Sequence, residues 1–173
     1  MAQAGLLPAA RKEVSVLRYT LTPSSLPPLR TVSRESDLTA AGINDACTRL
    51  RSWSLIIGEQ LTGLPFLRLS GELHCEVHIP VAGRVHPHPE TGVSWEIGEG
   101  GLAVALRTVR FEELRSVMRE LNGEIAVNCG LAGPVEFHPS TAEFHHGTVI
   151  WPVHRIPADL TRSVGPHLIE VGA

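Results

Sequence analysis

The sequence runs through the same order of elements twice, and this repetition constrains the fold more than any other feature. One strand ends at Ile79-Pro80-Val81 and another at Trp151-Pro152-Val153, so an apolar residue, proline and valine recur 72 positions apart. A strand tolerates proline only where its missing N–H is not needed, so a second strand with the same ending favours duplication. Two alike halves can pair their sheets around a cleft.

Hydrophobic periodicity gives each half the order strand, strand, helix, strand, strand. The strands are expected over residues 15–21, 29–34, 66–69 and 73–81 in the first half, and 93–97, 102–109, 135–138 and 147–153 in the second. The two helices carry apolar stripes at Ile43, Ala46, Leu50, Trp53 and Ile57, and at Leu114, Val117, Met118 and Leu121. The run 22–28 is expected to be a connection, because its prolines cannot donate to a ladder, and 85–92 is expected to be an exposed link between the halves.

Composition excludes several classes of function. The 173 residues include 15 Lys plus Arg against 18 Asp plus Glu, so no broad basic field is present to hold nucleic-acid phosphates. The longest apolar stretches, such as 102–106, fall far short of the roughly 20 residues that cross a bilayer. Cys47, Cys75 and Cys129 form no CxxC pair, which favours free thiols and a cytoplasmic location.

The motifs resemble those of the GyrI-like small-molecule-binding domains, the BmrR-type effector-binding family found in MerR-type multidrug regulators. The resemblance spans about Val14 to Val153 and rests on five segments: Thr31-Val32-Ser33-Arg34, Gly63-Leu64-Pro65-Phe66, Glu76-Val77-His78-Ile79-Pro80-Val81, Pro134-Val135-Glu136-Phe137-His138-Pro139 and Val149-Ile150-Trp151-Pro152-Val153. Each motif is short, but their order and spacing together are fairly specific.

The resemblance implies an α+β fold of duplicated ββαββ halves with pseudo-twofold symmetry. Two antiparallel sheets would surround a central ligand cleft, covered by two helices. The expected boundaries are an N-terminal extension over 1–13, the domain over 14–156 with halves 14–82 and 93–154, and a C-terminal tail over 157–173.

MerR-type regulators carry a DNA-reading helix-turn-helix and a dimerising helix ahead of this domain. About 13 residues precede the resemblance here, so we expect no direct DNA binding by this chain. The chain is similar to the stand-alone members, of which some sequester toxins, some modulate gyrase and some hydrolyse cyclopropane-containing antibiotics.

Glu76 is the first candidate site residue. Alternation places it with His74 and His78 on one strand face, while Cys75 and Val77 take the other. An acid within an apolar strand must reach solvent, find a partner or accept a shifted pKa. From alternation alone, Glu76 also fits a solvent-facing surface, paired with a cation such as Arg107 or Arg155.

The family commonly has an acid at the position of Glu76, four residues before the strand-ending proline. At the matching position of the second half many members have another Glu, and this chain has Thr148. The resemblance therefore implies that Glu76 lies in the pocket, and Thr148 weakens the case for a cationic ligand.

Aromatic residues are the candidate pocket walls, because flat ligands stack on rings and cations are attracted to ring faces. The chain has only 8 aromatic residues, 3 Trp, 1 Tyr and 4 Phe, so an aromatic pocket must use several of them. Trp151, Trp95 and Tyr19 are favoured, and Trp53 is nearly equal to them. The full set of candidate walls is Tyr19, Trp53, Phe66, Trp95, Phe111, Phe137 and Trp151.

Nine histidines raise the question of a metal site. No zinc-finger or HExxH spacing is present, so neither metal nor cofactor is expected. His78 instead suits a hydrogen-bond partner or proton shuttle in the pocket. Gly98-Glu99-Gly100-Gly101 lacks the spacing of a dinucleotide fingerprint and is interpreted as a turn.

Three functions stay open at this point. The first is capture of a hydrophobic aromatic small molecule, in some cases cationic, for drug sequestration, sensing or resistance. The second is hydrolysis of a cyclopropane-containing or similarly strained antibiotic, with Glu76, His78 and Tyr19 as the catalytic candidates. The third is haem binding, as in the structurally related SOUL proteins, and it ranks last because no axial His is identified. The ligand and any protein partner are not identified by sequence.

Overall fold

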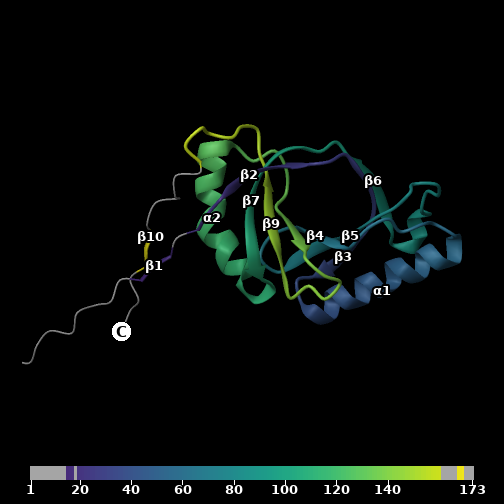
Figure 1. The fold of residues 1–173 in the computed structure, drawn as a ribbon. Coiled ribbons are helices and arrows are strands. Elements are labelled where there is room, and N and C mark those ends of the chain that lie inside the picture. The colour runs from purple at the N-terminus through teal and green to yellow at the C-terminus, as the bar shows by residue number, and fades with distance from the viewer. Residues whose placement is uncertain (1–14, 18, 161–166, 170–173) are drawn as a thin grey trace, which may run out of the picture.

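The computed structural model describes residues 15–17, 19–160 and 167–169 of the 173-residue chain (Figure 1). The first half contains β2 (Thr22–Leu26), β3 (Leu29–Asp37), α1 (Ala40–Ile57), β4 (Phe66–Leu69) and β5 (His74–Pro80). The second half contains β6 (Ser94–Gly98), β7 (Gly101–Arg110), α2 (Leu114–Cys129), β8 (Glu136–Pro139) and β9 (His146–Pro152). Short 3-10 turns at Pro89–Thr91 and Phe111–Glu113 precede β6 and α2, and β1 (Ser15–Leu17) pairs with β10 (His167–Ile169) as a separate ribbon.

The main sheet has eight antiparallel strands in the order β2-β7-β9-β8-β4-β5-β3-β6. This order is symmetric about the β4–β8 pair, so each strand of one half has a counterpart in the other. The halves also exchange strands, because β2 pairs with β7 and β6 pairs with β3. The sheet is therefore built jointly by both halves.

The expected α+β class, with two ββαββ halves and two covering helices, is confirmed. The two expected sheets are joined into one, because Leu67 and Arg68 of β4 pair with Phe137 and Glu136 of β8. The expected domain boundaries stay predictions.

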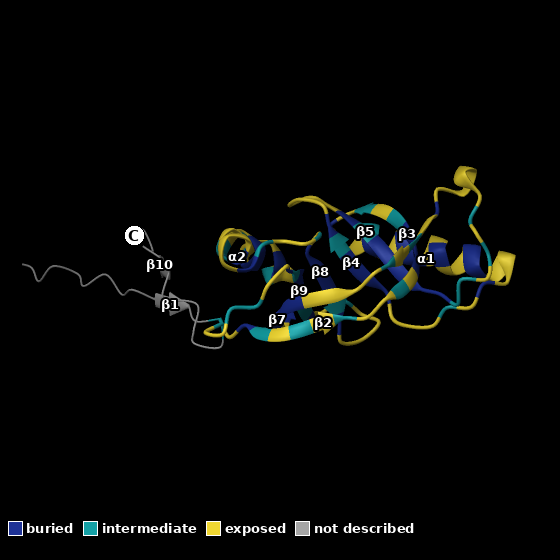
Figure 2. Ribbon diagram, turned by 90° about the horizontal axis from the view of Figure 1, so that it is seen from above, coloured by how far each residue is buried: buried dark blue, intermediate teal, exposed yellow. Residues whose placement is uncertain are grey.

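Both helices cover the same face of the sheet, and their apolar stripes form the main core with alternate strand residues. This core includes Leu50 and Leu121 from the helices, and Leu67, Phe137 and Val149 from the strands. Figure 2 shows the middle strands largely in dark blue, with exposed residues on the outer sides of both helices. No helix of the described residues covers the opposite face of the sheet.

The start and end of α1 follow from local chemistry. Thr39 precedes the helix in an extended conformation, and its hydroxyl accepts the Gly42 N–H at 3.1 Å. Gly58 ends the helix with a φ of 78°, a left-handed conformation that glycine adopts without strain.

Two expected elements are wrong. The first strand was expected over 15–21, but of the described residues there only Ser15–Leu17 form a strand, and it belongs to the separate ribbon with β10. The proline-rich run at 22–28 was expected to be a connection, but Thr22–Leu26 forms strand β2. β2 stands at one end of the sheet and pairs with β7 on one side, so Pro23 does not have to donate to a second neighbour.

Among the described residues, no helix is long and apolar enough to cross a membrane.

Candidate functional site

A cleft of about 510 Å³ opens on the sheet face opposite the helices. Its floor comes from the middle strands, and its rim comes from β2, β6 and the loops that lead into β8. The charged and ring-bearing side chains that line it are Phe66, Arg68, Glu96, Glu99, Glu136 and His138, with Thr31 and Ile150 beside them.

A Glu-x-His motif occurs on both strands that flank β4. Glu76 and His78 lie on β5, and Glu136 and His138 lie on β8. In each motif the His Nε2 meets the Oε2 of the glutamate two residues earlier, at 3.0 Å on β5 and 2.7 Å on β8. Alternation along a strand puts residues two apart on one face, so both pairs lie on the face opposite the helices.

Phe66 of β4 lies between the two histidine rings. Its ring stacks on His78 with centroids 5.1 Å apart and on His138 with centroids 4.6 Å apart, at interplanar angles of 16° and 6°. This contact follows from the register, because Phe66 is opposite His78 in the β4–β5 pair. The three parallel rings fix one another's orientation across three strands.

Arg68, also on β4, holds two carboxylates across the cleft. Its guanidinium pairs with Glu96 of β6 and, at 3.4 Å, with Glu136 of β8. Glu136 is well buried, with 8% of its side chain exposed. The Arg68 Nε is also buried and finds no hydrogen-bond partner among the described residues.

His78 is fully buried and makes hydrogen bonds at both ring nitrogens. Its Nε2 meets Glu76 at 3.0 Å and its Nδ1 meets the hydroxyl of Thr31 at 2.9 Å. Burial, and then the positive charge of Arg68, lowers the pKa of His78 below its usual value, although Glu76 and Glu96 act in the opposite direction. His78 is therefore a neutral imidazole at pH 7.

Glu76 itself lines a neighbouring cavity of about 690 Å³ rather than the cleft. That cavity lies at the edge of the sheet, where β3 continues beyond its pairing with β6, and its lining includes residues of β3, the start of β5 and α1, among them Arg34, Asp45 and Arg49. The Glu76 side chain is 40% exposed there. His78 thus separates Glu76 from the cleft, and the partner of Glu76 is this histidine rather than Arg107 or Arg155.

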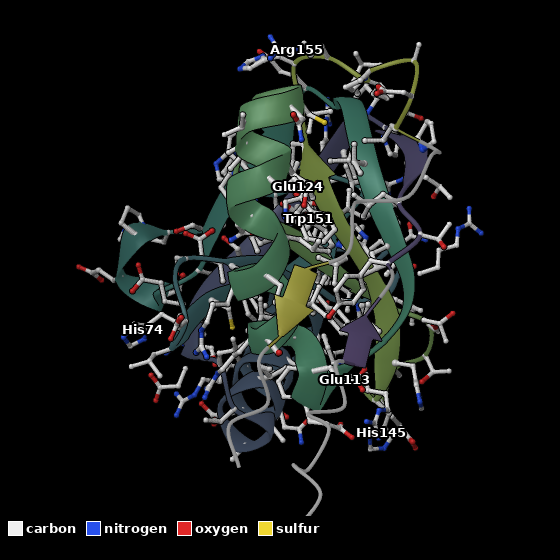
Figure 3. The ribbon with its side chains drawn as sticks, turned by 90° about the vertical axis from the view of Figure 1, so that its left-hand side faces the viewer. His74, Glu113, Glu124, His145, Trp151 and Arg155 are labelled. Carbon is white, nitrogen blue, oxygen red and sulfur yellow. The ribbon has the colours of Figure 1, made fainter. Side chains whose placement is uncertain are left out.

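Three of the aromatic candidates lie in the helix-side core. Trp53, Phe137 and Trp151 are buried among the residues that join the helices to the sheet. Figure 3 shows Trp151 beside α2, where its Nε1 donates to the Oδ1 of Asn122 at 2.7 Å. Alternation explains this placement, because Trp151 follows Ile150, which faces the cleft.

Three further candidates lie elsewhere. The hydroxyl of Tyr19 donates to Glu120 of α2 at 2.7 Å, so Tyr19 is not brought together with Glu76 and His78. Trp95 is 42% exposed on β6, with its ring 4.3 Å from that of His86. Phe111 packs edge-on against Phe137, 6.2 Å between centroids. Of the seven predicted wall residues, only Phe66 lines the cleft.

Sequence reasoning did not single out Arg68, Glu96, Glu136 or His138. The sequence did hold a signal for two of them, because Glu136-Phe137-His138 repeats the pattern of Glu76-Val77-His78. Nothing comparable marks Arg68 and Glu96, which meet only because β6 is brought across from the other half.

Comparison with known proteins supports the fold through solved structures. No family model and no curated protein matches the sequence. The crystal structure of the EcmrR C-terminal domain matches with a TM-score of 0.61 and 13% identity, over 80% of this chain and 99% of that one. The fold is consistent with that of the GyrI-like domains.

Two further solved structures match the fold of this chain. EcmrR in its DNA complex matches with a TM-score of 0.61 and 13% identity, over 80% of this chain and 58% of that one. A hydrolase from Listeria innocua matches with a TM-score of 0.50 and 13% identity, over 79% of this chain and 92% of that one.

The described side chains of the cleft are not arranged as a metal site. Among the residues that the structure describes, no group of three or more His, Cys, Asp or Glu side chains is arranged to hold a metal ion. Cys47, Cys75 and Cys129 are buried and free, and burial raises the pKa of each thiol. The arrangement in the cleft is therefore suited to hydrogen bonding, ring stacking and charge recognition.

Proposed function

We propose that this chain binds a flat, hydrophobic aromatic small molecule that carries positive charge, in the cleft between Phe66, Glu96 and Glu136. The excess of carboxylates over cations in the cleft lining carries the proposal. Glu96, Glu99 and Glu136 line the cleft together with one arginine, Arg68.

The charge balance favours a cation. Arg68 is shared between Glu96 and Glu136, so a single positive charge meets two carboxylates at short range. Glu136 is largely removed from water, and a buried carboxylate is stabilised when a second opposite charge arrives. Because Glu96 and Glu136 share one guanidinium, part of their negative charge is left for water to stabilise. A ligand cation would take the place of that water.

The rings and apolar side chains of the lining favour an aromatic body. Phe66 and His138 both line the cleft and are held parallel by their stacking, which presents a fixed set of ring edges to the ligand. Leu26 and Ile150 add apolar surface on the other side. The cavity of about 510 Å³ is in the range of sites that hold drug-sized ligands.

The biological role that we propose is drug sequestration, sensing or resistance. The match to the EcmrR C-terminal domain supports a binding module, and the match to a hydrolase keeps a chemical role as the second candidate. The pair of Glu76 and His78 favours that second candidate, because it places a neutral imidazole next to the cleft. The substrate class would be a cyclopropane-containing or similarly strained antibiotic.

Titration with a rhodamine cation, followed by fluorescence anisotropy, tests the binding proposal. We expect saturable binding that weakens by about 10- to 100-fold in Glu136→Gln, the range for a charge-assisted contact of about 1.5–3 kcal/mol. Fluorescein, an anion with the same three-ring xanthene core, should bind far more weakly than the cation. Mass spectrometry of the recovered ligand separates capture, which leaves its mass unchanged, from hydrolysis, which adds one water.

Glu90→Gln is the matched control, because Glu90 is 89% exposed and lies outside the cleft. Its affinity should equal that of the unmodified protein. Glu76→Gln in the same titration decides whether Glu76 or Glu136 is the anchor. Binding that does not saturate, or equal affinity in Glu136→Gln, would contradict the proposed site.

A further inference from the structure

We propose that Thr31 is a nucleophile that accepts the acyl group of an activated ester in the cleft, with His78 as its general base and Glu76 as the positioning residue. The proposal rests on the proposed function in one respect, since the ester must enter the same cleft.

The three side chains form one hydrogen-bonded chain. The Thr31 hydroxyl is 2.9 Å from His78 Nδ1, and His78 Nε2 is 3.0 Å from Glu76 Oε2. A hydroxyl, an imidazole and a carboxylate in this order are the arrangement by which acyl-transfer enzymes activate a hydroxyl. Thr31 comes from β3 and the other two come from β5, so the pairing of these strands assembles the chain.

Glu76 determines which nitrogen of His78 acts as the base. A carboxylate only accepts hydrogen bonds, so the proton of the neutral ring lies on Nε2 and the lone pair lies on Nδ1. The Thr31 hydroxyl therefore donates to Nδ1. Stacking on Phe66, with centroids 5.1 Å apart, holds the ring plane in this orientation.

His78 is in the basic form at pH 7. Burial and Arg68 of β4 lower its pKa, while Glu76 of its own strand and Glu96 of β6 raise it, and the net direction is downward. Thr31 of β3 and Phe66 of β4 complete its surroundings. A neutral imidazole can take the hydroxyl proton, and Glu76 then stabilises the imidazolium.

The hydroxyl stands at the wall of the cleft. Thr31 is 2% exposed and lines the cleft beside Phe66, Arg68 and Glu96.

The second half of the chain shows that the fold does not require these polar groups. Ala103 takes the position of Thr31 in the second half. Thr31 pairs with Pro80 and Ala103 pairs with Pro152, the strand-ending proline of each half. Ile150 and Thr148 then match His78 and Glu76, two and four residues before that proline. The apolar residues Ala103 and Ile150 take the places of Thr31 and His78 in the second half, so the buried polar chain of the first half is not needed to build the sheet.

The reaction needs no further reagent than water. The Thr31 Oγ forms a bond to the acyl carbon and gives its proton to His78 Nδ1, and the bond from that carbon to the leaving oxygen then breaks. The leaving oxygen takes the proton from His78. Water subsequently attacks the acyl carbon, its proton passes through His78 to the Thr31 Oγ, and the carboxylic acid leaves.

Acetylation by p-nitrophenyl acetate tests the proposal, with the site located by peptide mass spectrometry. We expect acetyl on Thr31, no labelling of that peptide in Thr31→Val, and labelling in Thr31→Ser. Thr62→Val, an exposed threonine, should match the unmodified protein. Background acetylation of amines is limited, because the chain offers only the amino terminus and one lysine, Lys12.

The pH profile separates a positioning role of Glu76 from a structural one. The acetylation rate should rise through the pKa of His78 and level off below neutral pH. In Glu76→Gln the plateau should fall at least about tenfold, and the inflection should move to lower pH because an anion that favours the imidazolium is lost.

Acetyl found only at Lys12, the amino terminus or a histidine would overturn the proposal, and so would equal release of p-nitrophenol in Thr31→Val. If Thr31→Val does not fold, the peptide map of the unmodified protein and Thr31→Ser decides. Rhodamine binding without Thr31 acetylation would refute this proposal alone. Acetylation without rhodamine binding would refute the cationic-ligand function alone.

Discussion

Glu76 and Glu136 lie on the two strands that flank β4, yet their surroundings give them different uses. Glu76 keeps 40% of its side chain exposed and hydrogen-bonds His78, whereas Glu136 is 8% exposed and contacts both Arg68 and His138. The more buried carboxylate gains more from an added cation, because less water competes for it. At the scale of single residues, Glu136 is therefore the stronger candidate anchor and Glu76 the stronger candidate for orienting His78.

Tyr19 provides a direct reporter, because it is the single tyrosine of the chain. Burial, and then the hydrogen bond and negative charge of Glu120, raises the pKa of Tyr19 to about 12. We expect ultraviolet absorbance titration to show one phenolate transition near pH 12, moving toward the ordinary value of about 10 in Glu120→Gln.

The same shift predicts how stability depends on pH. The folded pKa of Tyr19 is higher than the unfolded one, so its contribution to stability is full below pH about 10 and is lost as pH rises toward 12. Unfolding of Tyr19→Phe should be less sensitive to pH over this interval. A phenolate transition at the ordinary value in the folded protein would contradict the contact with Glu120.

At the scale of elements, the link between β5 and β6 is held by one buried carboxylate. Glu59, just after α1, is 5% exposed and accepts the backbone N–H groups of Gly83, Arg84 and Val85 at 3.1, 2.9 and 2.8 Å. These donors belong to the segment that leads from the first half to the second. The end of α1 thus fixes the start of the link.

Glu59→Gln should lower the free energy of unfolding by about 1–3 kcal/mol, because an amide presents two donors where backbone N–H groups require an acceptor. Urea unfolding followed by circular dichroism measures the change. Glu90→Gln, in the same link but exposed, should stay within about 0.5 kcal/mol. Equal effects of the two substitutions would contradict the clamp.

At the scale of the whole molecule, the two halves depend on each other for strand partners. β2 pairs with β7, and β6 pairs with β3, so each half alone has an edge strand with no neighbour of its own half. Core residues Leu67 and Phe137 also meet across the β4–β8 seam. The cleft is likewise shared, since Glu96 and Glu136 of the second half meet Arg68 of the first.

We therefore expect the segments 14–82 and 93–154 to lack stable structure when expressed separately. Far-ultraviolet circular dichroism should show little sheet for either segment, and mixing them in equal amounts should recover part of the signal of the whole chain. Native-like spectra for one isolated segment would contradict this mutual dependence. The outcome also tests the expected boundaries of the halves.

The sequence by itself determined the order strand, strand, helix, strand, strand, its repetition and the two apolar helix stripes, and it predicted Phe66, Glu76 and His78 as site residues. These properties depend on periodicity and on short motifs, which are local in the chain. The expected connection at 22–28 was wrong because the restriction on proline depends on whether the strand has one neighbour or two, and only the tertiary structure fixes that number.

The tertiary structure alone decided which side chains share a cavity. Alternation correctly puts Trp151 and Phe137 opposite Ile150 and Glu136, but it does not say which face of the sheet the helices cover. The contact of Arg68 with Glu96, and the passage from Glu76 through His78 to Thr31, join residues on different strands. Such contacts are set by strand pairing and sheet curvature across the whole molecule, which no local pattern records.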